Sequence, residues 1–113
     1  MLSALGKAAR RGVSCRIVLT SNPAWANAVA ELSNAGCSVH LLPATETWLY
    51  MHEKMLLTDD TSLIVGSQNI STTSLLENRE LSLSLDTTSA PAVITAVSST
   101  FDNDYAAAPR AQQ

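Results

Sequence analysis

Residues 52–69 read His-Glu-Lys-Met-Leu-Leu-Thr-Asp-Asp-Thr-Ser-Leu-Ile-Val-Gly-Ser-Gln-Asn, and this stretch decides how the second half of the chain folds. Residues 52–54 are polar and 55–57 are apolar, and in an extended segment Met55 and Leu57 would point to the face opposite His52, Lys54 and Leu56. The polar cluster at 59–62 has the residue types of a turn, and the apolar run 63–65 indicates a buried strand. We therefore expect a hairpin that returns residues 66–69 beside the start of its first strand.

The same stretch carries side chains that suit a phosphate group. In an extended segment His52 and Lys54 project to one face, because successive side chains alternate. A neutral imidazole can act as a nucleophile near neutral pH, and an ammonium can neutralise a phosphate oxygen. Ser67 and Asn69 can donate neutral hydrogen bonds to the same oxygens, and Gly66 lets the backbone approach closely. The stretch therefore predicts a phosphate-handling site that needs no metal ion.

Written as a pattern, the stretch is H-x-K-x4-D followed by x6-G-S-x-N. This pattern resembles the signature of the phospholipase D superfamily, whose members hydrolyse or transfer phosphodiesters. Six fixed positions match by chance with odds on the order of one in a million at average residue usage. The resemblance implies a phosphodiesterase that forms a covalent phosphohistidine and uses no cofactor.

The resemblance also implies roles for single residues. His52 takes the position of the nucleophile or acid, and Ser67 that of a supporting hydrogen bond. Asp59 matches the aspartate of the motif, although its place at a strand end suits local structural bonding. Glu80 matches a carboxylate that orients a catalytic histidine in relatives, typically across a pseudo-twofold axis. The expected catalytic residues are His52, Lys54, Asp59 and Glu80, and the expected phosphate-binding residues are Lys54, Ser67 and Asn69.

Catalytic relatives assemble two such motifs about a twofold axis, within one chain or between two. This chain has one motif, so the resemblance implies that a partner supplies the second histidine. We expect the C-terminal half of a longer protein or a truncated gene, with a homodimer as the smaller alternative. The isolated monomer is expected to show no appreciable turnover.

Three functions remain open. They are a phosphodiesterase acting on phospholipid-type diesters, a nuclease of the same family, and a non-catalytic half retained for assembly. The net charge of −3 and the isoelectric point near 5.1 favour a lipid or unspecified diester over nucleic acid. Four of the seven cations lie within residues 7–16, where we expect them to solvate a helix face.

Length and hydropathy indicate one globular domain over residues 1–106 with a frayed tail at 107–113. The 113 residues are 46% hydrophobic, enough for a core. No stretch approaches a membrane-spanning helix, and the start lacks the apolar core of a signal peptide. We expect a soluble chain and leave its compartment open.

The first half predicts alternating helices and strands. A helix closed by Gly12 precedes a strand at 14–20, and a helix from Asn22 to Gly36 precedes a strand at 37–42. A strand, helix and strand in succession favour a parallel pair. A half-buried strand at 80–85, with its leucines on one side, and a helix at 90–105 complete the fold. We expect an α/β protein, specifically an α/β/α sandwich with a mixed, mainly parallel sheet, lacking one or more N-terminal strands.

Several residues outside the motif have open interpretations. Cys15 and Cys37 are expected to be buried small side chains, and a disulfide, which needs an oxidising compartment, is the alternative. We expect His40 to be a solvated strand-end residue. Trp48 and Tyr50 could line the entrance to the site, but packing is at least as good an explanation.

Overall fold

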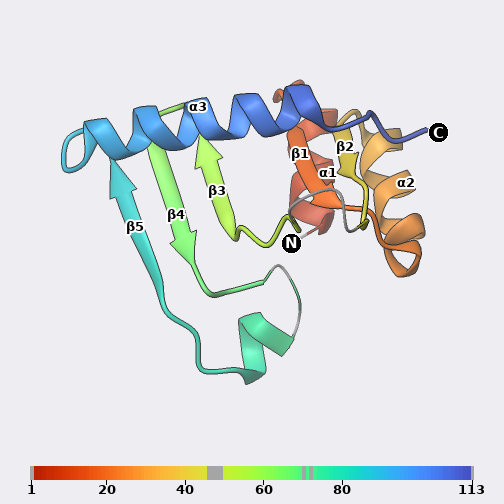
Figure 1. The fold of residues 1–113 in the computed structure, drawn as a ribbon, viewed down its shortest axis with the longest axis horizontal. Helices are drawn as coiled ribbons and strands as arrows, with labels where there is room; N and C mark the ends of the chain where they lie inside the picture. The colour runs from red at the N-terminus through yellow and green to blue at the C-terminus, as the bar shows by residue number, and fades with distance from the viewer. Residues whose placement is uncertain (1, 46–49, 70, 72, 113) are drawn as a thin grey trace. The chain divides into compact units, whose positions relative to one another are not determined.

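The computed structural model describes residues 2–45, 50–69, 71 and 73–112 (Figure 1). Trp48 therefore lies outside the described residues. The chain divides into two compact units, Met1–His52 with Asn103–Gln113 and Glu53–Asp102, which we describe separately. The elements in chain order are α1 (Leu2–Arg10), β1 (Arg16–Thr20), η1 (Pro23–Trp25), α2 (Ala26–Ala35), β2 (Ser38–Leu42), β3 (Met55–Thr58), β4 (Ser62–Gly66), η2 (Thr73–Glu77), β5 (Ser82–Asp86) and α3 (Pro91–Ala107).

The first unit contains a parallel pair of strands, as the sequence predicts. β1 and β2 pair in parallel with Ile17 opposite Val39. Gly12 ends α1 with a φ of 91°, and its amide donates to the Ala9 carbonyl, which is the bonding expected after a helix. The predicted helix start at Asn22 is confirmed, because its side chain accepts from the Ala24 amide. The first turn after it, η1, is a 3-10 helix that leads into α2.

Helices cover both faces of β2. Val39 belongs to a buried cluster with Leu32 of α2, and Leu5 of α1 packs against that cluster. Alternate strand residues point to the other face. There Ser38 accepts a hydrogen bond of 2.6 Å from the hydroxyl of Tyr105, which lies in α3. The first unit therefore has three layers, with α1 and α2 on one side and the end of α3 on the other.

The two cysteines form a disulfide. Cys15 lies just before β1, and Cys37 lies just before β2. The expectation of two separate buried thiols is therefore wrong, although Cys37 is buried. The cause is the parallel register, in which Arg16 pairs with Ser38 and so brings the preceding residues together.

The end of the chain is bonded to β2, so the expectation of a frayed tail at 107–113 is wrong for its described part. Leu41 donates its amide to the Pro109 carbonyl at 2.8 Å, and Ala111 donates to the Val39 carbonyl at 2.8 Å. Ala108 is buried. These bonds pair backbone groups at one edge of β2. They hold the segment in place, although its small and polar side chains are typical of a free chain end.

The second unit contains an antiparallel sheet in the order β3-β4-β5 (Figure 1). The predicted hairpin is confirmed, and Asp59 and Asp60 both have a φ of 53° in its turn. Aspartate tolerates this left-handed conformation better than most side chains. β3 begins at Met55, so His52 and Lys54 both lie before the strand. That their side chains share a face stays a prediction.

The burial within this sheet differs from the expectation. Leu63 of β4 is buried, but its neighbour Ile64 is 49% exposed, so the strand is not buried on both faces. In the segment at 80–85, Leu81 and Leu83 are 76% and 58% exposed. The leucine side is therefore not the buried side near Glu80. Alternation shows which residues share a face but not which face is covered.

The α/β class is confirmed, with both parallel and antiparallel strand pairs. Among the described residues, one strand pair is parallel and two are antiparallel. The predicted last helix is confirmed as α3. Ile94 of α3 is buried, and Ser98 donates to the Asp60 carboxylate at 2.9 Å, so the helix contacts the hairpin turn. The single domain expected over residues 1–106 stays a prediction.

Candidate functional site

Ser67 and Glu80 form the core of the candidate site in the second unit. The Ser67 hydroxyl donates to Oε2 of Glu80 at 2.5 Å, and Asn78 donates its Nδ2 to Oε1 at 3.3 Å. The same hydroxyl oxygen accepts from the Leu81 amide at 3.1 Å, and the Ser67 amide donates to the Leu81 carbonyl at 3.0 Å. Both carboxylate oxygens are therefore held by neutral donors.

Lys54 and Asn69 belong to the same end of this sheet. The Gly66 amide donates to the Lys54 carbonyl at 3.2 Å, which fixes the backbone before β3 beside the end of β4. Asn69 is exposed two residues beyond Ser67. The structure therefore brings together the chain segments that carry Lys54, Ser67 and Glu80.

Gly66 makes this close approach possible. A Cβ atom added to it would meet the Leu81 carbonyl oxygen and would lie 2.5 Å from both Cα and Oγ of Ser82. A side chain at this position would push β5 away from β4 and separate Ser67 from Glu80.

His52 is exposed at the end of the first unit. Its ring centroid lies 5.8 Å from that of Tyr50, and the two rings are tilted. The residue before it, Met51, is anchored by Thr20, whose hydroxyl donates to the Met51 carbonyl and accepts from the Met51 amide, both at 3.1 Å. Thr20 is 4% exposed and ends β1. The approach of His52 to Lys54 stays a prediction.

The sequence reasoning missed Thr20, which anchors the backbone of Met51 just before His52. A threonine at the end of an apolar strand gives a weak signal, because β-branched residues are common in strands. Its buried hydroxyl must find a partner, and that requirement could have drawn attention to it. Its partner lies 31 residues away, however, so no local pattern identifies the contact.

Asp59 is not brought to the other expected site residues of the second unit. It lies in the turn after Thr58, whereas the Lys54 backbone bonds to Gly66 at the opposite end of the hairpin. Four residues of β3 separate the two ends, which is about 13 Å. This position suits the turn, and the catalytic role expected for Asp59 stays a prediction that the geometry of the hairpin does not support.

His40 is held in the layer between β2 and α3, which corrects its expected strand-end solvation. Its Nδ1 lies 2.7 Å from the carbonyl oxygens of both Tyr105 and Ala108. Carbonyls only accept, so Nδ1 carries the proton. The imidazole also stacks on the Tyr105 ring with 3.8 Å between centroids. His40 is therefore a structural residue of the first unit.

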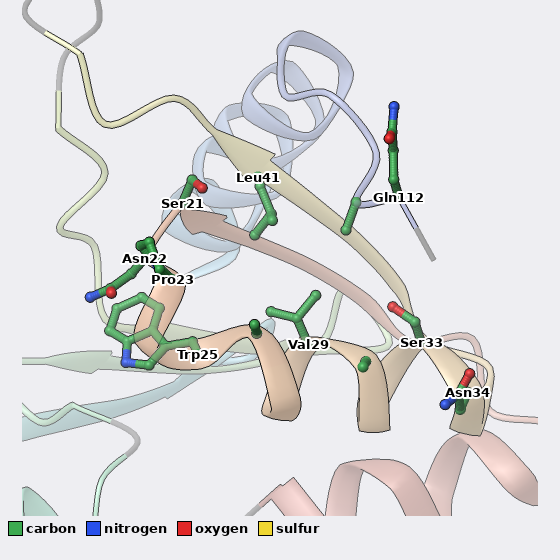
Figure 2. Close-up of a pocket in the computed structure, with 12 residues that line it drawn as sticks. Ser21, Asn22, Pro23, Trp25, Val29, Ser33, Asn34, Leu41 and Gln112 are labelled. Atoms are coloured by element: carbon green, nitrogen blue, oxygen red, sulfur yellow. The ribbon is translucent and has the colours of Figure 1, made fainter.

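A cavity of about 350 Å³ in the first unit is distinct from the expected phosphate site (Figure 2). Val29 of α2 and Leu41 of β2 point toward it, and Trp25 lies at its edge. The described residues that line it carry no charged side chain, so they offer a phosphate no opposite charge.

The comparisons with known proteins agree with this fold. A family model described as cardiolipin synthase, PLD-like domain, matches residues 1–105. The chain therefore belongs to the phospholipase D-like family. No curated protein matches the sequence. Among the described residues, no helix is long and apolar enough to cross a membrane.

Two solved structures share the fold. Nuc from Salmonella typhimurium, described as a phospholipase D family member, is similar with a TM-score of 0.84 and 18% identity over 99% of this chain and 73% of its own. NucT from Helicobacter pylori is similar with a TM-score of 0.53 and 16% identity over 97% of this chain and 90% of its own. At these identities the likeness establishes the fold alone.

Proposed function

We propose that the chain is one half of a phosphodiester hydrolase or transferase, and that a second half supplies the other histidine. The Ser67–Glu80 hydrogen bond carries the proposal, because it ties the Glu80 carboxylate to the motif segment. A carboxylate so held can orient a histidine and raise its basicity. Membership of the phospholipase D-like family supports the same reaction class.

In the proposed first step, a ring nitrogen of His52 attacks phosphorus and the bond from phosphorus to the leaving oxygen breaks. The histidine of the second half gives its proton to that oxygen. The same histidine then takes a proton from water or an alcohol, whose oxygen attacks phosphorus and releases His52. Lys54 and Asn69 stabilise the negative oxygens throughout.

Ser67 takes a different role in this proposal from the expected phosphate contact. A hydroxyl has one proton, and Ser67 donates it to Glu80. Its amide is also bonded, to the Leu81 carbonyl. Ser67 therefore acts on the substrate through Glu80, as a positioning residue, and leaves the direct phosphate contacts to Lys54 and Asn69.

We propose phospholipid-type diesters as the substrates, with nucleic acid as the second candidate. The net charge of −3 opposes long-range attraction of a polyanion. The family description supports a lipid substrate by analogy. The names Nuc and NucT belong to the neighbours, and the site chemistry is the same for both diesters.

The decisive experiment measures hydrolysis of bis-p-nitrophenyl phosphate by the assembled protein. We expect His52→Asn to abolish turnover, because asparagine cannot form the phosphoramidate bond. The adjacent Glu53→Gln is the matched control and should retain activity. Mass spectrometry of quenched wild-type protein should show a p-nitrophenyl phosphoryl adduct on His52. Activity that survives in His52→Asn would refute the mechanism, and an inactive wild-type assembly would favour the non-catalytic half.

Substrate class is decided by a second assay. Wild-type protein is given phosphatidyl vesicles or single-stranded DNA at two salt concentrations. The proposal expects lipid turnover that changes little with salt. DNA cleavage with binding that falls by orders of magnitude over a few-fold rise in salt would assign the nuclease alternative instead.

A further inference from the structure

The segment after α3 pairs with the free edge of β2, and we call Pro109–Ala111 the tail strand. The Leu41 amide donates to the Pro109 carbonyl at 2.8 Å. The Ala111 amide donates to the Val39 carbonyl, also at 2.8 Å. This is the backbone bonding by which an extended segment is added to the edge of a sheet.

The side chain of Ala111 lies on the α2 side of this pair. His40 is opposite Arg110 in the antiparallel bridge, so Ala111 is opposite Val39. Opposite residues in such a pair project to the same face. Val39 belongs to the buried cluster with Leu32 of α2, and Ala111 packs against that cluster. The tail strand therefore turns this methyl group toward α2.

The cavity of the first unit lies directly beside Ala111. This residue lines the cavity together with Val29 of α2, Leu41 of β2 and Trp25 (Figure 2). The volume of about 350 Å³ is several times what a leucine side chain adds to an alanine. The tail strand thus supplies one methyl group where there is room for a much larger side chain.

We propose that the edge of β2 and this cavity form a binding site for an extended segment of a partner protein, with a large apolar residue at the position of Ala111. The tail strand shows the backbone bonding that the partner's segment would make. In this mode of recognition the backbone bonds supply affinity, and a pocket for a side chain supplies specificity. The described residues that line the cavity carry no charge, so it favours leucine or phenylalanine over a charged side chain. The inference is independent of the proposed reaction, because no residue of the candidate site takes part.

A partner's segment must displace the tail strand. The tail strand is tethered and so competes at an effective concentration on the order of millimolar. Its small side chains leave the cavity open, which gives the partner an advantage. Each methylene group buried from water strengthens binding about fourfold, and leucine adds three carbon atoms to alanine. A segment with leucine at this position should therefore bind at least tenfold more tightly than one with alanine.

The first test is made within the chain. Ala111→Leu should fill the cavity and raise the temperature of half unfolding by several degrees. Ala107→Leu is the matched control, because Ala107 is exposed at the end of α3 and its substitution should give no such rise. An unfolding temperature of Ala111→Leu at or below that of the wild type would overturn the inference, since the cavity would not accept the larger side chain.

The second test adds peptides to the variant Ala111→Asp, in which a carboxylate aimed at an uncharged cavity should release the tail strand. The peptide Ala-Pro-Arg-Leu-Gln repeats the sequence of residues 108–112 with leucine at the decisive position. The control peptide is Ala-Pro-Arg-Asp-Gln. Titration calorimetry measures the affinity of each, and the NMR shift of the Leu41 amide, whose present acceptor is Pro109, reports the place. We expect the leucine peptide to bind at least tenfold more tightly and to move this shift.

Equal affinities for the two peptides would overturn the inference, and so would a leucine peptide that leaves the Leu41 amide unchanged. If Ala111→Asp does not fold, the titration is made on the wild type, where the leucine peptide must displace the tail strand and the same outcomes decide. Indole, titrated in parallel, would overturn the inference by binding as tightly as the leucine peptide, because the cavity would then be a site for small molecules. Sedimentation that shows dimers of Ala111→Leu but monomers of the wild type would assign the site to the tail of a second copy instead.

Discussion

The hydroxyl of Ser67 and the carboxylate of Glu80 are joined by a hydrogen bond of 2.5 Å, across 13 residues of chain. The bond connects the residue after β4 to the segment before β5. The same hydroxyl oxygen accepts from the Leu81 amide, so the Ser67 side chain links the end of β4 to the start of β5. The segment between them, which includes η2, is thereby held at both of its ends.

We expect Ser67→Ala to lower both stability and turnover. The substitution leaves Oε2 of Glu80 and the Leu81 amide without this partner, at a cost of about 1 kcal/mol in the free energy of unfolding. Turnover should fall at least tenfold with KM little changed, since Ser67 acts through Glu80. Ser67→Thr keeps the hydroxyl and should restore activity. Urea unfolding and steady-state kinetics measure both effects, and Ser84→Ala on β5 is the control.

Gly66→Ala and Gly6→Ala should change stability in opposite directions. At Gly66 the new methyl group would collide with the backbone of β5, which should cost about 1–3 kcal/mol. At Gly6, inside α1, the nearest atom is the Ala35 Cβ at 3.5 Å, an ordinary contact. Alanine there should stabilise the helix by about 0.5–1 kcal/mol. Thermal unfolding compares the two, and equal effects would contradict the close approach at Gly66.

The elements of the fold could be predicted from sequence because their signals are local. The asparagine cap, the closing Gly12 and the two aspartates of the hairpin turn each act within a few residues. The contacts that could not be predicted join distant residues. His40 bonds to carbonyls 65 and 68 residues away, and the tail pairs with β2 although its own composition is typical of a free end.

The candidate site divides in the same way. The resemblance to the family pointed to Ser67 and Glu80, and the structure brings them together. The sequence could not show that the Ser67 hydroxyl donates its proton to Glu80, because that hydrogen bond depends on side-chain geometry. Nor could it reveal Thr20, whose contact with Met51 arises from tertiary packing. Asp59 matched the motif in sequence, yet the hairpin places it at the end away from Lys54.

Thr20→Val should reduce turnover through the position of the chain before His52. Valine has a similar shape but no hydroxyl, so the Met51 amide and carbonyl lose this partner. We expect a loss of about 1–2 kcal/mol in stability and a lower kcat. Thr20→Ser keeps the hydroxyl and should recover most of the activity. Equal kcat values for the valine variant and the wild type would contradict the positioning role.

Reduction of the Cys15–Cys37 disulfide should destabilise the protein. The bond closes a loop with a sequence separation of 22, and loop closure of this size contributes about 3 kcal/mol. We expect dithiothreitol to lower the urea midpoint of the wild type. The double variant Cys15→Ala with Cys37→Ala should start at a lower midpoint and should not respond to the reductant. A response of the double variant would show that reduction acts elsewhere.

Protonation of Asp86 should make the protein less stable in acid. The Ser89 amide donates to its Oδ1 at 2.7 Å, and this bond is the main reason that its pKa lies below the ordinary value of 3.8. The Ser89 hydroxyl and the Thr88 amide lower the pKa further, against a small opposing effect of burial. Because the folded pKa is depressed, this stabilisation is fully present above about 3.8.

The stabilisation of Asp86 is lost as the pH falls below 3.8 through the folded pKa. The measurement is the urea midpoint between pH 6 and pH 2.5 for the wild type and for Asp86→Asn, whose side chain accepts the same amide hydrogens without titrating. We expect the wild type to be more stable at pH 6 and the two midpoints to converge in acid. If the two midpoints changed in parallel with pH, Asp86 would not couple protonation to folding. The charge of Asp86 would then not stabilise the turn before α3.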